Sequence, residues 1–176
     1  ASCFGGSAWE FVPERGQYYF HYFSKKQPDL NWACPELREE IFSMMNWWVA
    51  KGVEGFRVDA ISYLDKPQDF PDSKLPPRPD GYSFPDCLTC RPGTHDHIRE
   101  MNRRVYSPGN VMTVGEVSAP TVEELANYVR TEREEFDMAI PFVPPIEEIN
   151  TWSPEKLKHD AWESYRIMPE EGWWAR

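Results

Sequence analysis

Long apolar runs are missing from this sequence. It contains no stretch of about 18 apolar residues, whereas a membrane-spanning helix needs about 20. Its first residues also lack a positively charged segment followed by an apolar one, which is the pattern of a secretory signal peptide. We therefore expect neither a membrane span nor a signal peptide, and no membrane partner.

Cysteine is scarce as well. Cys3, Cys34, Cys87 and Cys90 are too few and too unevenly spaced for a disulfide framework, which favours a reducing compartment such as the cytoplasm. The motif CLTC, which runs from Cys87 to Cys90, has the spacing of metal ligands. No second CxxC and no HxxxH accompanies it, so we interpret it as a pair of loop cysteines and expect no metal.

Positive charge is in deficit. The 19 basic residues face 29 acidic ones, and the net charge of −10 argues against nucleic acid or an anionic membrane as the main partner. A neutral or cationic ligand fits this charge better. Aromatic residues make up 15% of the chain, and they either line a site where flat apolar ligand faces stack or simply fill a core.

Phosphate-binding motifs are also absent, since neither GxGxxG nor GxxxxGK[ST] follows a predicted strand. Apolar spacing predicts helices over 35–51, 96–106, 121–129 and 153–161, and strands within 52–64, 110–117 and 136–142. Pro35 suits the first helical position, Pro108 and Gly109 should stop the second helix, and the TVEE motif at 121–124 and Ser153 should cap the last two helices. This alternation predicts an α/β fold with parallel strands. The sheet is either doubly wound or part of a (β/α)8 barrel.

Two segments depart from the alternation. Residues 1–34 contain QYYFHYF between glycine-rich and proline-containing stretches, and they fit a hairpin or an excursion better than a βα unit. Residues 65–93 hold many Pro, Asp and Gly and predict a long loop. The short apolar run after Gly55 has little alternation, so we expect a strand that is covered on both faces.

Charged side chains stand near the ends of two predicted strands. Asp59 and Glu116 lie one βα unit apart, and the carboxyl ends of parallel barrel strands build the active site. Glycoside hydrolysis uses two such carboxylates, about 5–5.5 Å apart in retaining enzymes and further apart in inverting ones. Arg57 precedes Asp59 by two residues, so both point to one side and the guanidinium can keep Asp59 ionised and oriented. The alternative is a structural ion pair with Glu116 on the surface.

Several motifs resemble glycoside hydrolase family 13, the α-amylase family. GFRVDAI at 55–61 is similar to its nucleophile strand, and TVGEV at 113–117 is similar to its acid/base strand. The oligo-1,6-glucosidase and α-glucosidase branch of the family is indicated by FGGSAWE at 4–10, FSKKQPDLNW at 23–32 and WSPEKLK at 152–158. The resemblance covers nearly the whole chain.

The resemblance implies a retaining α-glucosidase that acts on oligosaccharides or disaccharides, with no cofactor and no metal in the chemistry. Asp59 would be the nucleophile, Glu116 the general acid and base, and Arg57 the residue that orients Asp59. Phe4 would border the glucose pocket, although local packing explains it equally well. Ala60 would line the path to the scissile bond, where a small residue accompanies α-1,4 or mixed α-1,4/α-1,6 preference.

A further implied feature is the mode of attack on the sugar chain. Tyr63 stands where endo-acting amylases place a histidine, which favours an exo-acting enzyme. The alternative function is a non-catalytic fragment of an α-amylase-family protein that binds sugar or a partner.

Two family motifs are not found in the sequence. Neither the early DxxxNH nor the late NHD, which supplies a third carboxylate, is present, and His159 and Asp160 follow Lys158 inside a predicted helix. We therefore expect an internal fragment: residues 1–34 end an inserted subdomain after the third strand, and residues 35–176 form a partial catalytic barrel with about strands four to six. We expect no glucosidase turnover from such a fragment alone.

Overall fold

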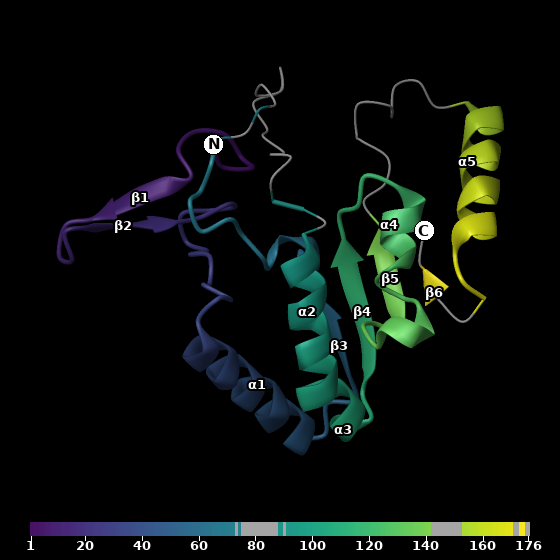
Figure 1. The fold of residues 1–176 in the computed structure, drawn as a ribbon, viewed down its shortest axis with the longest axis horizontal. Helices are drawn as coiled ribbons and strands as arrows, with labels where there is room; N and C mark the ends of the chain where they lie inside the picture. The colour runs from purple at the N-terminus through teal and green to yellow at the C-terminus, as the bar shows by residue number, and fades with distance from the viewer. Residues whose placement is uncertain (73, 75–87, 90, 142–152, 171–172, 175–176) are drawn as a thin grey trace.

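The computed structural model describes residues 1–72, 74, 88–89, 91–141, 153–170 and 173–174. The N-terminal segment forms an antiparallel hairpin of β1 (Trp9–Val12) and β2 (Gln17–Phe20), as the sequence predicts. The hairpin projects away from the main sheet (Figure 1). Cys87 and Cys90 of the CLTC motif lie outside the described residues.

The main sheet has four parallel strands in chain order. They are β3 (Gly55–Val58), β4 (Met112–Val117), β5 (Met138–Pro141) and β6 (Trp173–Trp174). Each neighbouring pair is parallel, and β4 and β5 end at the same edge of the sheet (Figure 1). Parallel strands in chain order, connected by helices, make a segment of a (β/α)8 barrel. The three predicted strands are confirmed, and β6 is a short further strand that pairs with β5.

Helices connect these strands. The structure contains α1 (Pro35–Ala50), α2 (Pro92–Met101), α3 (Ser107–Gly109), α4 (Val122–Ala126) and α5 (Pro154–Ile167). Two predicted caps are confirmed: the side chain of Thr121 accepts from the Glu124 amide, and that of Ser153 accepts from the Lys156 amide. Among the described residues, no helix is long and apolar enough to cross a membrane.

Several helix boundaries differ from the prediction: α2 begins at Pro92 instead of near Asp96, and α5 extends to Ile167 beyond Ala161. At its C-terminal end α2 continues as a π-helical stretch (Asn102–Tyr106) and then as α3, so the helix does not stop before Pro108. Pro108 lies in the first turn of α3, where a proline is tolerated, and the chain leaves the helix at Asn110 with a φ of 48°. α4 ends at Ala126 instead of near Val129, because the next residues form tighter turns such as Val129 N–H to the Ala126 carbonyl.

The prediction that the strand after Gly55 is covered on both faces was wrong. β3 has only four residues, and Arg57 within it is exposed. A one-turn 3-10 helix, η1 (Ile61–Tyr63), follows the strand, so the apolar residues after Asp59 belong to η1. The apolar run thus reflects a strand and a buried turn in succession.

Two apolar clusters hold the chain together. The larger one packs the sheet against the helices, and its fully buried members include Phe42, Ile98, Val105, Val117, Leu125 and Ala139. The smaller one joins the N-terminal segment to η1 through Cys3, Tyr22, Tyr63 and Leu88. Burial raises the pKa of the Tyr22 phenol, as expected for a hydroxyl that loses water. Aromatic residues therefore contribute to both clusters, which supports the core-filling interpretation for many of them.

A buried carboxylate ties α2 to the segment before β5. The side chain of Glu135 is fully buried, and its oxygens contact His95 Nδ1 at 2.7 Å, Arg99 Nη1 at 3.1 Å and Arg133 Nη2 at 2.9 Å. A buried charge is tolerable when it is paired and hydrogen-bonded in this way. Glu135 is thus a packing centre on the helical side of the sheet.

We expect Glu135→Gln to lower the free energy of unfolding by about 2–3 kcal/mol, because an amide leaves two guanidinium groups without their anion. Chemical denaturation followed by circular dichroism measures this change. The matched control is Glu132→Gln at an exposed position, which should stay within about 0.5 kcal/mol of the parent. Equal stability of the two variants would contradict the role assigned to Glu135.

Candidate active site

The parallel register brings Asp59 and Glu116 to the same level of the sheet. Val58 is paired with Gly115, so the residues that follow them, Asp59 and Glu116, both lie at the carboxyl edge of two neighbouring strands. Asp59 follows directly after β3, and Glu116 is the penultimate residue of β4. This is the edge at which parallel barrels build their active sites.

One guanidinium joins the two carboxylates. Arg57 donates from Nη1 to Asp59 Oδ1 and from Nη2 to Glu116 Oε1. A planar fork with fixed donor directions can hold two acceptors at once, which a lysine ammonium does less specifically. The sequence predicted the contact between Arg57 and Asp59, and the structure adds the contact with Glu116.

The two carboxylates have different surroundings. In the described chain, the side chain of Asp59 is 71% exposed, whereas that of Glu116 is only 15% exposed. The second oxygen of Glu116 accepts the Ala60 amide at 3.0 Å. Glu116 is therefore fixed through both oxygens, whereas Asp59 has one oxygen in contact with Arg57.

Ala60 has a left-handed backbone conformation, with φ of 46° and ψ of 37°. An L-residue other than glycine adopts this conformation at a cost, and such residues are found at sites where the surroundings impose them. Here the conformation turns the Ala60 amide toward Glu116 and starts η1 immediately after Asp59. The turn thus links the positions of both carboxylates through the backbone.

The segment after Asp59 is anchored from two sides. Ser62 Oγ accepts the Ser118 amide at 2.8 Å, which ties η1 to the end of β4. The ring of Tyr63 packs on Tyr22 with centroids 4.8 Å apart and meets the edge of Phe23 at 5.8 Å. These contacts were not predicted, because a serine or tyrosine after a strand carries no signal for a partner so far away in the sequence.

Phe4 lies on the N-terminal side of the same aromatic group. It is 61% exposed, and its ring is 6.0 Å from that of Phe23, which in turn contacts Tyr63. The structure therefore connects Phe4 to the turn after Asp59 through one intervening ring. Its contacts combine local packing with an exposed ring face.

Gly115 explains a small residue inside the TVGEV motif. A Cβ at this position would lie 2.8 Å from two ring carbons of Phe136, closer than real Cβ contacts. The glycine therefore lets the Phe136 ring pack against β4, directly before Glu116. Glu116 depends on this packing for the course of its strand.

We expect Gly115→Ala to destabilise the protein by about 1–3 kcal/mol, because the added methyl group overpacks the contact with Phe136. Thermal unfolding measures the change. Phe136→Leu combined with Gly115→Ala should recover part of the lost stability relative to the sum of the two single changes, and strict additivity would contradict the proposed contact.

The late His-Asp pair lies outside this group of residues. Asp160 belongs to α5 and accepts from Lys156 Nζ at 2.9 Å, one helical turn away. His159 is in the same helix, as the sequence predicts. Neither residue is brought to the strand ends that carry Asp59 and Glu116.

Comparison with known proteins agrees with this geometry. The family described as "Alpha amylase, catalytic domain" matches residues 1–168. An α-glucosidase of Pediococcus pentosaceus is 43% identical over 80% of this chain and 25% of its own length. An oligo-1,6-glucosidase of Heyndrickxia coagulans is 46% identical, again over 80% of this chain and 25% of its own. The chain thus spans about a quarter of the length of these relatives.

Solved structures give the same result. Trehalose-6-phosphate hydrolase of Bacillus licheniformis is 42% identical, with a TM-score of 0.71 over 80% of this chain and 24% of that one. Isomaltulose synthase of Klebsiella sp. LX3 is 32% identical, with a TM-score of 0.84 over 98% of this chain and 32% of that one. Sequence, fold and strand-end carboxylates together establish that the chain belongs to the α-amylase family, glycoside hydrolase family 13.

Proposed function

We propose that the protein carrying this chain is a retaining α-glucosidase that removes terminal α-linked glucose from oligosaccharides or disaccharides. The observation that carries the proposal is the Arg57 guanidinium, which contacts Asp59 and Glu116 at the ends of neighbouring strands. Relatives described as α-glucosidase and oligo-1,6-glucosidase support it. A protein that only binds sugar or a partner would not need Arg57, Asp59 and Glu116 in this arrangement.

The two carboxylates divide the chemistry. An Asp59 oxygen attacks the anomeric carbon and forms a covalent β-glucosyl ester, while the glycosidic C–O bond breaks and Glu116 gives its proton to the leaving oxygen. Glu116 then takes a proton from water, and the water oxygen attacks the same carbon and releases Asp59. Two inversions restore the α configuration. Arg57 orients the Asp59 carboxylate in both steps, first as the attacking group and then as the leaving group.

The residues around the two carboxylates bear on which substrate the site accepts. Ala60 follows the nucleophile and offers only a methyl group, which supports α-1,4 or mixed α-1,4/α-1,6 preference. Phe4 presents an exposed ring, and aromatic faces suit the apolar faces of a glucose ring. Tyr63 is buried on Tyr22, so the position where endo-acting relatives carry a histidine serves packing here.

We also propose the surroundings in which the protein works. Residues 1–34 form the end of an inserted subdomain and residues 35–176 part of the catalytic barrel. Cys3 and Cys34 are free thiols, which supports a reducing compartment such as the cytoplasm. The net charge of −10 supports a neutral sugar substrate over nucleic acid.

The roles of the carboxylates predict distinct products from two variants of the protein expressed from its complete reading frame. Asp59→Gly and Glu116→Gly should each hydrolyse p-nitrophenyl α-glucoside at least about 10³-fold more slowly than the parent. Azide should then give β-glucosyl azide with Asp59→Gly, by a single displacement, and α-glucosyl azide with Glu116→Gly, by attack on the glucosyl ester. The parent should release α-glucose first, as proton NMR can follow. Release of β-glucose by the parent would contradict the retaining mechanism.

Arg57→Lys should lower kcat/KM by about 100-fold, because one ammonium cannot reproduce two directed contacts to separate carboxylates. Steady-state hydrolysis of the same glucoside measures the loss. Arg15→Lys, at an exposed position of the hairpin turn, is the matched control and should leave kcat/KM unchanged. Equal activity of Arg57→Lys and the parent would refute the bridging role.

A further inference from the structure

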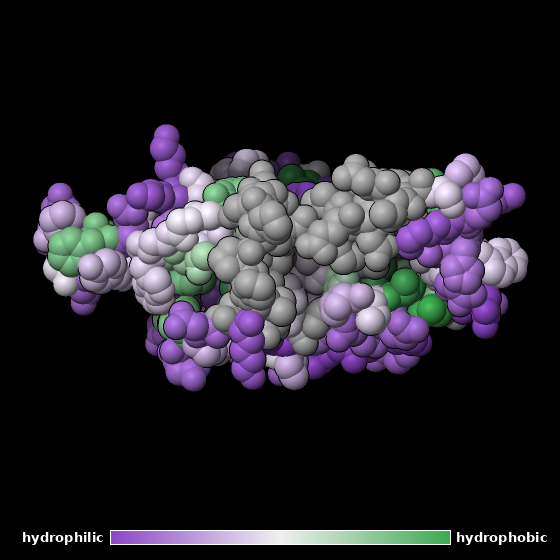
Figure 2. Space-filling model, turned by 90° about the horizontal axis from the view of Figure 1, so that it is seen from above, coloured by the Kyte–Doolittle hydropathy of each residue, from purple (hydrophilic) through white to green (hydrophobic). Residues whose placement is uncertain are grey.

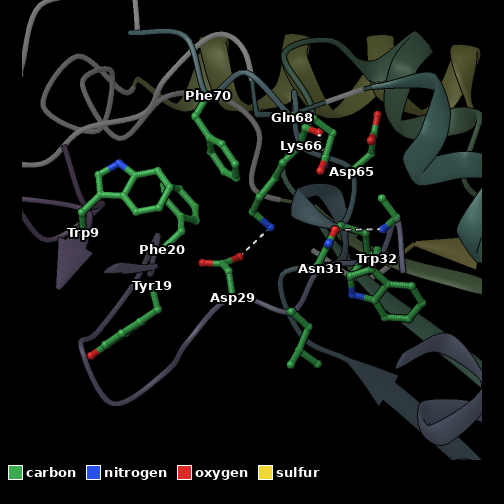
Figure 3. Close-up of a pocket in the computed structure, with 13 residues that line it drawn as sticks. Trp9, Tyr19, Phe20, Asp29, Asn31, Trp32, Asp65, Lys66, Gln68 and Phe70 are labelled. Carbon is green, nitrogen blue, oxygen red and sulfur yellow. Dashed lines mark hydrogen bonds and ion pairs between the residues drawn. The ribbon is translucent and has the colours of Figure 1, made fainter. Parts of the chain in front are cut away.

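A buried ion pair joins the N-terminal segment to the chain that follows Asp59. Lys66 Nζ lies 2.5 Å from Asp29 Oδ1, and the two side chains are only 8% and 17% exposed. Both side chains line a pocket of about 270 Å³ whose wall also includes the rings of Trp9, Phe20 and Phe70 (Figure 3). The pair therefore lies in an aromatic environment and crosses between two parts of the chain.

Each member of the pair also holds the backbone of its own side. Lys66 Nζ donates to the Tyr63 carbonyl at 2.6 Å, and Tyr63 is the last residue of η1. Asp29 Oδ2 accepts the Tyr22 amide at 2.6 Å. The rings of Tyr22 and Tyr63 pack on each other at the same junction. The ion pair thus fixes two backbone positions whose side chains are in contact.

A short series of hydrogen bonds connects this pair to the catalytic carboxylates. From Lys66 the series passes to the Tyr63 carbonyl, and the Tyr63 amide donates to the Ala60 carbonyl at 3.2 Å. The Ala60 amide donates to Glu116, and Asp59 is the residue before Ala60. Lys66 therefore holds the far end of the turn that begins at Ala60.

Stability alone does not explain an ion pair at this position. Desolvating two charges costs about as much free energy as their attraction returns, so a buried pair contributes little net stability. A pair that also holds the Tyr63 carbonyl and the Tyr22 amide instead specifies one geometry. A comparable pair at the surface of the hairpin, Lys25 with Glu10, is 67% and 37% exposed and lies outside the series that ends at Glu116.

We propose that Asp29 and Lys66 are positioning residues for the glucosidase reaction. They hold η1 against the N-terminal segment and so keep the side chains of Asp59 and Glu116 in their relative positions. This inference rests on the proposed function. Neither residue touches the reacting atoms, so their effect acts through the turn at Ala60. Loss of the pair therefore affects turnover more than affinity for the glucoside.

The test compares Lys66→Met, Asp29→Asn and the double variant in the protein expressed from its complete reading frame. Either single change leaves the remaining buried charge without its counter-ion. The double variant removes both charges, and the side-chain amide introduced by Asp29→Asn still offers an oxygen that can accept the Tyr22 amide. The double variant should therefore recover most of the thermal stability lost in the single variants. Lys25→Met is the matched control for loss of a lysine that pairs with the hairpin.

In the folded double variant we expect kcat for p-nitrophenyl α-glucoside to fall at least about 10-fold, with KM within about threefold of the parent. The amides of Ala60 and Tyr63 should exchange hydrogen at least about 10-fold faster than in the parent, because their turn has lost the Lys66 contact. Lys25→Met should match the parent in both readouts. A pair with only a structural role would give a double variant with recovered stability, recovered kcat and unchanged exchange.

Hydrogen exchange separates this proposal from the proposed function. If the parent protein does not hydrolyse α-glucosides, the proposed function fails, and the exchange of Ala60 and Tyr63 still decides whether the pair holds the turn. Unchanged exchange at these amides in the folded double variant overturns the positioning role, whatever the turnover. Faster exchange together with the loss of kcat supports it.

Discussion

The contact of one guanidinium with two carboxylates is the constraint on which the rest of this structure depends. Arg57 can reach both Asp59 and Glu116 only if β3 and β4 are adjacent, parallel and in the observed register. That arrangement is supported by Gly115, which leaves room for Phe136, and by the apolar cluster that packs the helices against the sheet. The geometry of the candidate active site is therefore a consequence of strand pairing and core packing.

The N-terminal segment extends this constraint beyond the sheet. The hairpin itself lies away from the sheet, yet the chain that follows it contacts the turn after Asp59 through Tyr22, Asp29 and the aromatic rings of the smaller cluster (Figure 1). Seen from above, the hairpin end is mainly hydrophilic with a small apolar area (Figure 2). Phe11 and Tyr18 are exposed aromatic residues of the hairpin. Exposed aromatic residues are also present on α5, at Trp162 and Tyr165.

Much of this arrangement could be predicted from local features of the sequence. Pro35 and the apolar spacing after it predicted α1, the TVEE motif predicted the cap of α4, and Ser153 predicted the start of α5. Asp59 and Glu116 were found because a charge at the end of an apolar strand is unusual and because the α-amylase family motifs contain them. Each of these signals is contained within a few neighbouring residues.

The features that the sequence did not reveal depend on distant parts of the chain. Nothing near Lys66 indicates that its partner is Asp29, and nothing in GFRVDAI indicates that Ala60 adopts a left-handed conformation to reach Glu116. The exposure of Arg57 also differs from the prediction of a strand covered on both faces, because an apolar run does not say which face other elements cover. The helical segment that begins with α2 extends past Pro108, because this proline lies in the first turn of α3, directly after the π-helical stretch.

We propose that Asp59 is the nucleophile and that Arg57 holds it beside Glu116. The most direct measurement is mass spectrometry of the protein, expressed from its complete reading frame, after incubation with 5-fluoro-α-glucosyl fluoride, which forms a long-lived glucosyl ester. Proteolysis should place one fluoroglucosyl group on the peptide that contains Asp59, with fragmentation assigning it to that carboxylate. A label on Glu116 or on any other residue would contradict the account.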